Sequence, residues 1–171
     1  GYSSMIYEVA KIINKKKNKI NYDLKMVKGT SEKIFDSYQP EIKKAFGRKM
    51  ISEYGAAETG IIAFECSNEK MHIVMENVIV EEEKNEILVT NLWSKSFPII
   101  RYRLGDYVKL SSLYNCKCGM KHKIIEEVIG RIGQLIIGKK IQYPSLVLYY
   151  IFKNLAIDKN LEYKYQGFQN K

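Results

Sequence analysis

The sequence has few cysteines and no long apolar run. Three cysteines among 171 residues are an odd number and too few for a disulfide framework, so they favour a reducing, cytoplasmic compartment. No apolar segment approaches the roughly 18 residues that a membrane-spanning helix needs, and no secretory signal is visible. These absences argue against a disulfide-rich secreted domain and predict a protein without membrane insertion.

The sequence also lacks the signatures of several enzyme classes. No arrangement of Ser, His and Asp, or of Cys, His and Asp, indicates nucleophilic catalysis. No Gly-rich phosphate loop of the P-loop or Rossmann type is present. Any nucleotide chemistry must therefore depend on other residues.

Arginine is scarce although the net charge is +9. Positive charge can indicate nucleic acid or an acidic membrane surface. Here it comes almost entirely from scattered lysines, which is more typical of a compositional bias than of a binding patch. The dense basic run at 14–19 lies where a helix should end, and its positive charge would interact favourably with the negative end of the helix dipole. We therefore expect no nucleic-acid partner.

The first sixty residues predict helix–strand units. Ser3 precedes apolar residues at helical spacing, which predicts a capped amphipathic helix. A short buried strand is expected within 22–32. Helical spacing over 31–46 predicts a second helix that Gly47 closes, and another short strand is expected at 49–53.

The remainder of the chain predicts mostly β-structure. From Ile61 to about residue 128, short runs rich in β-branched residues alternate with polar turns, and 81–86 predicts a hairpin turn. Beyond this, a hairpin through Gly138 and a helix from about Pro144 are expected. The predicted fold class is α/β with α+β character, in which α/β units precede a β-rich subdomain.

An unusual motif follows the strand expected at 49–53. Tyr54 and Glu58 flank small residues in "YGAAETG", and glycines such as Gly55 let a ligand approach the backbone. A carboxylate here can hold Mg²⁺, which in turn binds phosphate oxygens, and an aromatic ring can stack on a base. The alternative is a tight turn with a solvated Glu58.

A second acidic motif is "RYRLGDYVKL". Asp106 follows Gly105 in an expected turn between two strand-like runs. A carboxylate there can accept two hydrogen bonds from a ribose diol. Ordinary hairpin chemistry of a Gly-Asp pair is the simpler alternative.

A third motif is "GTSE", which comprises Gly29, Thr30, Ser31 and Glu32. At a strand end it could present backbone groups to a flat heterocycle. Thr30 or Ser31 could also cap the helix expected next. The two interpretations are compatible.

Sulfur and imidazole groups form a fourth constellation. Three thiolates and one imidazole make a closed tetrahedral zinc site of the structural type. A disulfide between two cysteines one residue apart is sterically awkward. Cys66 as a buried core thiol and His122 as the imidazole are alternatives. The candidate ligands are Cys66, His72, Cys116 and Cys118.

These motifs occur in an order that resembles one family along nearly the whole chain. "ISEYGAAETGIIAFEC", "MHIVMENVIVE", "EILVTNL", "FPIIRYRLGDYVKL", "CKCG" and "IEEVIGRIGQLII" are similar to the adenylate-forming ligases. The likeness is greatest to the phenylacetate–coenzyme A ligase group, which includes relatives linked to capsular polysaccharide biosynthesis. Such enzymes activate a carboxylate with ATP, and coenzyme A then displaces AMP.

The resemblance implies a role for each motif. It places the segment from Gly29 to Glu32 against adenine, and Tyr54 with Gly55 at adenine and the acyl pocket. Glu58 would coordinate Mg²⁺ near the phosphates, and Asp106 would bind the ribose hydroxyls.

The resemblance also implies a domain organisation. Arg131, in "GR", matches the arginine at the hinge, and together with Glu58 it takes a catalytic role. Residues 1–128 would end the large adenylation domain, and 129–171 would be the hinge and the start of the small C-terminal domain. The cysteines and His72 match a zinc-type set in this branch of the family.

Departures from the family pattern limit this expectation. The Ser/Thr/Gly-rich phosphate loop is absent, Gly133 and Gln134 replace the acidic pair after the hinge, and no catalytic lysine can be placed. We expect a C-terminal-half fragment that is inactive alone. Its ligands would be ATP or AMP, Mg²⁺, a small carboxylic acid, coenzyme A or a carrier thiol, and structural Zn²⁺.

Two other interpretations stay open. The +9 charge, the 13 tyrosines and the C-x-C pair also fit a small zinc-stabilised basic module that binds nucleic acid. A remnant reading frame without catalytic function is the third. The acyl substrate cannot be told from the sequence, which also leaves a homodimer open.

Overall fold

A computed structural model describes residues 1–16, 23–112, 115–131, 135–137, 142–144 and 151. The chain divides into two compact units, Gly1–Gly130 and Arg131–Lys171, and each is described by itself. Within the described residues, no helix is long and apolar enough to cross a membrane. The expected division into the end of a large domain and the start of a small one stays a prediction.

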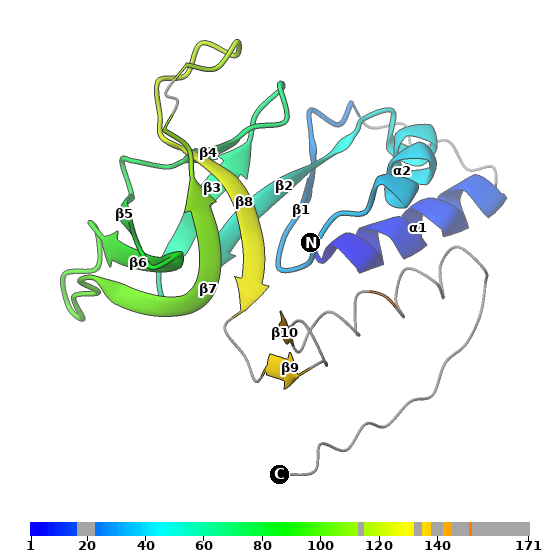
Figure 1. Cartoon of the computed structure of the whole chain (residues 1–171). Coiled ribbons are helices and arrows are strands. Elements are labelled where there is room, and N and C mark those ends of the chain that lie inside the picture. The colour runs from blue at the N-terminus through cyan, green and yellow to red at the C-terminus, as the bar shows by residue number, and fades with distance from the viewer. Residues whose placement is uncertain (17–22, 113–114, 132–134, 138–141, 145–150, 152–171) are drawn as a thin grey trace. The chain divides into compact units, whose positions relative to one another are not determined.

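In the described part of the first unit, β1 lies between the two α-helices in chain order, and only strands follow the second helix (Figure 1). This order agrees with the mixed α/β class that the sequence predicts. In chain order the elements are α1 (Ser3–Lys16), β1 (Val27–Gly29), the 3-10 helix η1 (Asp36–Tyr38), α2 (Gln39–Phe46), β2 (Met50–Ala56), β3 (Gly60–Glu65), β4 (Met71–Ile73), β5 (Val78–Glu83), β6 (Glu86–Asn91), β7 (Tyr102–Leu110) and β8 (Ile124–Arg131).

The strands form one sheet of eight strands in the order β1-β2-β3-β4-β8-β7-β6-β5. β1 and β2 are parallel, with Val27 opposite Met50. The pairs β2–β3, β3–β4, β4–β8, β5–β6 and β6–β7 are antiparallel. The insertion of β8 between β4 and β7 brings together turns that lie far apart in the sequence.

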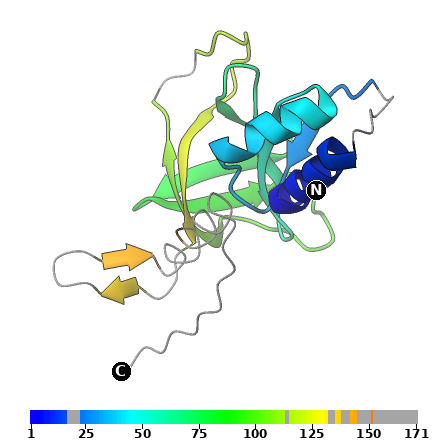
Figure 2. The same ribbon diagram turned by 90° about the vertical axis from the view of Figure 1, so that its right-hand side faces the viewer.

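The two α-helices pack against each other beside β1 and β2, as Figure 2 shows. The rings of Tyr7 and Tyr38 stack with centroids 4.3 Å apart, and Phe35 meets Tyr38 edge-on at 5.3 Å. Ala10 and Ile42 are fully buried between the helices. Full burial of a large apolar side chain stabilises a fold by about 1.5–3 kcal/mol, so this aromatic cluster anchors the helical layer.

A separate apolar cluster fills the β-rich part. Its members are buried aliphatic residues from the six strands β3 to β8, as alternation along half-buried strands predicts. Partly buried Tyr54 and Ala56 pack against it. The cluster contains Ile62, Ala63, Ile73, Val78, Val80, Ile87, Val89, Leu104, Val108 and Ile125.

The second helix is shorter than the sequence predicts. Residues 31–35 are not helical, and the helical segment starts with η1 and continues as α2. The apolar side chain of Phe35 lies at helical spacing, but its backbone is extended, with φ −89° and ψ 144°. Gly47 closes α2 as predicted, because its φ of 69° lets its N–H reach the Lys43 carbonyl.

The predicted hairpin at 81–86 is present. β5 and β6 pair antiparallel, with Glu83 opposite Glu86. Lys84 and Asn85 both have positive φ, 54° and 67°, which is the conformation of a two-residue type I′ turn.

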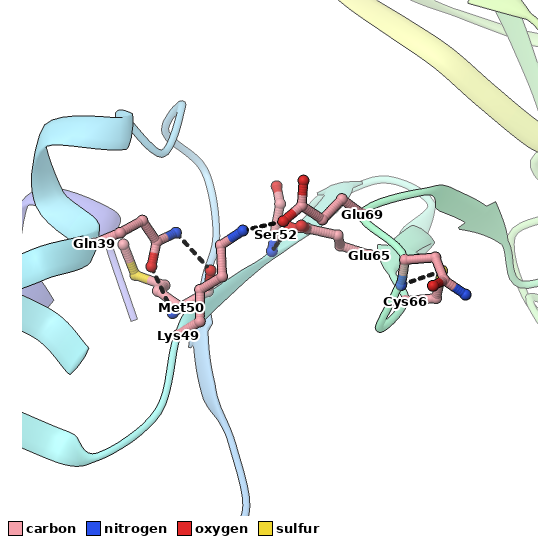
Figure 3. A network of polar contacts seen from close by, with 8 residues as sticks. Gln39, Lys49, Met50, Ser52, Glu65, Cys66 and Glu69 are labelled. Carbon is pink, nitrogen blue, oxygen red and sulfur yellow. Dashed lines mark hydrogen bonds and ion pairs between the residues drawn. The ribbon is translucent and has the colours of Figure 1, made fainter. Parts of the chain in front are cut away.

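Side chains satisfy the backbone where β2 begins (Figure 3). The Gln39 amide donates to the Met50 carbonyl at 2.9 Å and accepts from the Met50 N–H at 3.0 Å. Two residues further on, the Ser52 N–H donates to the Glu65 carboxylate at 2.7 Å. These bonds replace ladder partners that a strand end lacks, and they fix α2 and β3 to β2.

The described part of the second unit contains a small antiparallel hairpin of β9 (Leu135–Ile137) and β10 (Gln142–Pro144). This confirms strand pairing on both sides of Gly138. The helix expected from about Pro144 falls largely outside the described residues, and Gly133 and Gln134 lie outside them as well.

Candidate nucleotide site and metal centre

The first two acidic motifs meet directly in the folded chain. The Tyr54 hydroxyl donates a hydrogen bond of 2.7 Å to the Asp106 Oδ2 atom, across 52 residues of sequence. Both side chains are half-buried. The sequence analysis proposed Tyr54 and Asp106 separately as nucleotide-binding residues, and the structure places the two side chains in contact.

Each of these motifs lies at a β-bulge. The register between β2 and β3 shifts between Tyr54 and Gly55. On β6 the step from Glu86 to Leu88 shifts the partner on β7 from Tyr107 to Arg103, so β7 carries extra residues around Asp106. Bulges bend a strand and re-aim its side chains, and they occur often beside active sites.

The expected turn at Gly105-Asp106 is therefore wrong. β7 runs without interruption from Tyr102 to Leu110. Gly105 has a φ of 79°, and an added Cβ would meet no atom within 4 Å. Glycine is therefore favoured here by the backbone conformation and not by lack of space. A glycine with positive φ bends this strand instead of reversing it, and composition alone does not distinguish the two outcomes.

Gly55 has a different reason to be glycine. A Cβ atom at this position would lie 2.5 Å from the Gly60 carbonyl oxygen and 3.2 Å from the Ile61 Cα. No side chain fits this approach of β2 to β3. Close packing of β2 against β3 at the bulge thus explains why a residue without a side chain follows Tyr54.

Glu58 lies in the exposed turn between β2 and β3. The turn is closed by a hydrogen bond of 3.3 Å from the Thr59 N–H to the Ala56 carbonyl, and Thr59 itself is only 1% exposed. Glu58 thus follows directly after the strand end that carries Tyr54. Both interpretations of Glu58, a solvated turn residue and a magnesium ligand, are consistent with this position.

The segment from Gly29 to Glu32 contacts α1. Gly29 is buried, and an added Cβ would lie 2.6 Å from the Ser3 hydroxyl. The Glu32 carboxylate accepts hydrogen bonds from the Ser4 N–H at 2.8 Å and from the Ser4 hydroxyl at 2.6 Å. It therefore stabilises the positive end of α1, a role that the sequence analysis missed because 28 residues separate the two partners.

The expected cap by Thr30 or Ser31 is wrong. The residues before η1 and α2 are Phe35 and Tyr38, and neither makes a side-chain capping bond. Thr30 instead forms a parallel bridge with Tyr2. The placement of this segment against adenine stays a prediction.

The four sulfur and imidazole ligands come together. Their ligand atoms all lie within 4.8 Å of one another. Cys66 Sγ is 3.7 Å from Cys116 Sγ, and Cys118 Sγ is 3.4 Å from His72 Nε2. A tetrahedral zinc ion with bonds of about 2.3 Å to sulfur and about 2.0–2.1 Å to nitrogen would hold its ligands roughly 3.5–3.8 Å apart. The donor set and its spacing fit zinc.

Sheet topology explains why these ligands meet. Cys66 follows β3 and His72 lies in β4, whereas Cys116 and Cys118 lie in the connection from β7 to β8. β4 pairs with β8, with His72 opposite Ile124, so the two turns lie at one end of adjacent strands. The Gly119 N–H donates to the Cys116 carbonyl at 3.0 Å, which makes the C-x-C segment a tight turn.

His72 is the imidazole of this cluster. His72 Nδ1 lies 3.4 Å from the His122 carbonyl oxygen, so Nε2 faces the sulfurs, as metal-bound histidines are commonly oriented. His122 points elsewhere, with its Nε2 atom 3.2 Å from Glu76. The alternative assignment to His122 is therefore not supported by the geometry.

The electrostatics of the cluster favour the thiolate at Cys116 and disfavour it at Cys118. The backbone N–H of Cys118 and then the His72 side chain lower the pKa of Cys116 to about 6. Desolvation raises the pKa of Cys118. The thiolate is the form that binds metal. All three cysteines are free.

Two further residues, Arg131 and Asn91, bear on the candidate nucleotide site. Arg131 ends β8, and its side chain lies outside the described residues. Asn91, which the sequence analysis did not select, bonds to the turn that carries Glu58. Its sequence signal is weak, because any Asn side chain can bond backbone about two residues ahead in an Asx turn.

Comparisons with known proteins agree with this architecture. No family model matches the chain. The fold corresponds to part of an adenylate-forming acyl-CoA ligase, which confirms the resemblance that the motifs predict. A 2-hydroxyisobutyryl-CoA ligase, solved in complex with 2-HIB-AMP and CoA, matches 90% of this chain at a TM-score of 0.72 and 20% identity. Coronafacic acid ligase from Pectobacterium brasiliense matches 84% of this chain at a TM-score of 0.52 and 16% identity.

Two curated proteins also share sequence with the chain. The indoleacetate–lysine synthetase of Pseudomonas savastanoi is 31% identical over 99 residues, which are 55% of this chain and 25% of that protein. Protein CapK of Staphylococcus aureus is 23% identical over 136 residues, 77% of this chain and 30% of that protein. The chain thus spans about a quarter to a third of these relatives, and 40% of the 2-hydroxyisobutyryl-CoA ligase chain.

Proposed function

We propose that this chain is the nucleotide-holding part of an ATP-dependent acyl-adenylating ligase. The intact protein would form an acyl-adenylate from a small carboxylic acid and ATP, and a thiol such as coenzyme A would then displace AMP. The ligase-like fold supports this proposal, and the observation that carries it is the hydrogen bond between Tyr54 and Asp106. That bond joins the two motifs that the proposed function assigns to one nucleotide.

Asp106 would bind the ribose and Tyr54 the base. A carboxylate accepts several hydrogen bonds, so Asp106 can hold both the Tyr54 hydroxyl and a ribose diol. The Tyr54 hydroxyl bond fixes the ring orientation, which leaves an aromatic face for stacking on adenine. The backbone from Gly29 to Ser31 would complete the adenine contact, with Glu32 engaged at α1.

Glu58 and Arg131 would act on the phosphates. The exposed Glu58 carboxylate is a hard oxygen ligand of the kind Mg²⁺ prefers. When bound, magnesium would neutralise phosphate charge. The role of Arg131 at the hinge rests on its position after β8 alone.

The cysteine cluster would hold a structural zinc ion. Four protein ligands close the coordination sphere and leave no position for substrate. The cluster would therefore secure the β3–β4 turn to the β7–β8 connection and take no part in the reaction.

The charge distribution argues against the alternative of a nucleic-acid module. Several basic side chains in the described part of the chain form ion pairs with carboxylates, which neutralise part of the positive charge. These pairs join Lys28 to Glu53, Lys49 to Glu69, Arg101 to Glu81, Arg103 to Glu83 and Glu86, and Lys109 to Glu126.

Calorimetric titration of the chain with AMP tests the proposed function. Asp106→Ala should weaken AMP binding by roughly 10- to 100-fold, because a hydrogen bond to a charged group contributes about 1.5–3 kcal/mol. Asp23→Ala is a matched control, since the Asp23 side chain is 88% exposed. AMP affinity that is equal in all three proteins would contradict the ribose role. Steeply salt-dependent RNA binding without a response to AMP would favour the nucleic-acid module.

ATP–pyrophosphate exchange by this chain should be negligible, because it has no Ser/Thr/Gly-rich phosphate loop. Robust exchange would show that the expectation of inactivity is wrong. The same assay on a longer protein that includes this chain would show which acids are activated.

A further inference from the structure

The Asn91 side chain bonds backbone groups of two separate segments. Its Oδ1 atom accepts hydrogen bonds from the N–H groups of Trp93 and Ser94, both at 2.8 Å. Its Nδ2 atom donates to the Thr59 carbonyl at 2.9 Å. The amide orientation follows from its partners, because two N–H donors face one end and a carbonyl faces the other.

The bond to Thr59 reaches the turn that carries Glu58. Thr59 is 1% exposed and comes directly after Glu58. Within the described residues, the turn is otherwise closed by the bond of 3.3 Å from the Thr59 N–H to Ala56. Because the Glu58 side chain is exposed, its position depends on this backbone.

The other bonds reach the segment that leads into β7. Oδ1 fixes the start of the loop at 92–101, and the Asn91 N–H donates to the Ile99 carbonyl near the end of that loop at 2.9 Å. The Arg101 N–H then donates to the Thr90 hydroxyl at 2.9 Å. β7 follows and carries Asp106. One amide thus joins the Glu58 turn to the approach to Asp106.

We propose that Asn91 is a positioning residue that holds the Glu58 carboxylate at a set place relative to the Asp106 nucleotide site. It would thereby determine how strongly Mg²⁺ supports ATP binding. This inference rests on the proposed function, in which Glu58 binds magnesium and Asp106 binds ribose. Partners that orient a metal ligand commonly change metal affinity by about 10- to 100-fold when they are removed.

Asn91→Asp is the sharpest test. The carboxylate keeps the acceptors for Trp93 and Ser94 but loses the donor to Thr59 and faces its carbonyl with negative charge. ATP affinity is measured by calorimetry in Mg²⁺ and in EDTA. We expect the affinity in Mg²⁺ to fall about tenfold, with the affinity in EDTA unchanged. A merely structural role would lower both.

Matched variants complete the design. Ser94→Ala removes only the loop bond of 2.7 Å from its hydroxyl to the Phe97 carbonyl and should leave both affinities unchanged. Asn91→Ser serves if Asn91→Asp does not fold, because its hydroxyl can accept from the loop N–H groups but is too short for Thr59. It should give the same selective loss.

Glu58→Gln separates the inference from the proposed function. If Glu58→Gln abolishes the magnesium effect and the Asn91 variants retain it, the inference is overturned and the proposed function stands. If the unmodified chain shows no magnesium effect, both the magnesium role of Glu58 and the inference fail. A selective loss in the Asn91 variants that matches Glu58→Gln supports both.

Discussion

The cysteine cluster and the nucleotide site differ in how much of each this chain contains. The cluster supplies four ligand atoms within 4.8 Å of one another, which is a full set for structural zinc. The proposed nucleotide site comprises the Tyr54 ring and the carboxylates of Asp106 and Glu58, and the sequence has no phosphate loop. A closed metal site is thus a local property of two strand connections, whereas a nucleotide site needs several parts of a larger domain.

The largest expected effect is on the cluster. Cys118→Ser should reduce bound zinc from about one ion per chain to nearly none, because structural metal binding contributes directly to folding. The melting temperature should fall by on the order of 10 °C. Elemental analysis and thermal unfolding measure the two changes. Lys117→Ser, at the exposed residue between the cysteines, is the control.

Chelation gives an independent check of the same centre. Zinc removal from the unmodified chain should lower its melting temperature to that of Cys118→Ser and leave the variant itself unchanged. If the purified chain contains no zinc and added zinc does not change its melting temperature, the cluster is not a zinc site.

The next effect concerns the bulge that carries Tyr54. Gly55→Ala places a Cβ atom 2.5 Å from the Gly60 carbonyl, and such overpacking costs about 1–3 kcal/mol of unfolding free energy. Urea denaturation measures the loss. Gly47→Ala is the contrast, since its Cβ meets no atom within 4 Å but its φ is 69°. Because Gly55 does not have a positive φ, a loss near zero for Gly55→Ala would show that β2 and β3 relax enough to admit a Cβ atom.

A smaller effect is expected for the bond between the two nucleotide motifs. A double-mutant cycle of Tyr54→Phe and Asp106→Asn should give a coupling of about 1 kcal/mol in unfolding free energy. Additive losses would mean that the bond of 2.7 Å contributes nothing measurable, and the two motifs would then be neighbours without coupling.

The smallest effect tests the segment that contacts α1. Glu32→Gln should cost about 1 kcal/mol of stability, because it weakens the cap on Ser4, and should leave AMP affinity nearly unchanged. Urea denaturation and calorimetry measure these. A large loss of AMP affinity at unchanged stability would place the Glu32 carboxylate in the nucleotide site.

Local signals predicted those elements that depend on few neighbours. Ser3 and Ser4 at the start of α1, Gly47 at the end of α2 and the two-residue turn at Lys84 and Asn85 all follow from the conformational preferences of single residues. The residue types of the candidate zinc ligands were also predictable, because few residue types bind zinc and the chain has only three cysteines and two histidines.

Features that depend on distant partners were not predictable from the pattern. Residues 31–35 have helical spacing but are not helical, since Phe35 packs on Tyr38 and Glu32 is held by α1. The strand that continues through Gly105 looks like a turn in the sequence. The choice of His72 over His122 depends on the pairing of β4 with β8.

The sequence by itself determined the classes of element, the end of α2 at Gly47 and the chemical identity of the candidate ligands, because these depend on residue type and short-range spacing. The tertiary structure alone decided which groups meet. It joined Tyr54 to Asp106, Glu32 to α1 and Asn91 to the Glu58 turn, because sheet order and bulges set contacts between residues that the chain separates by 28 to 52 positions.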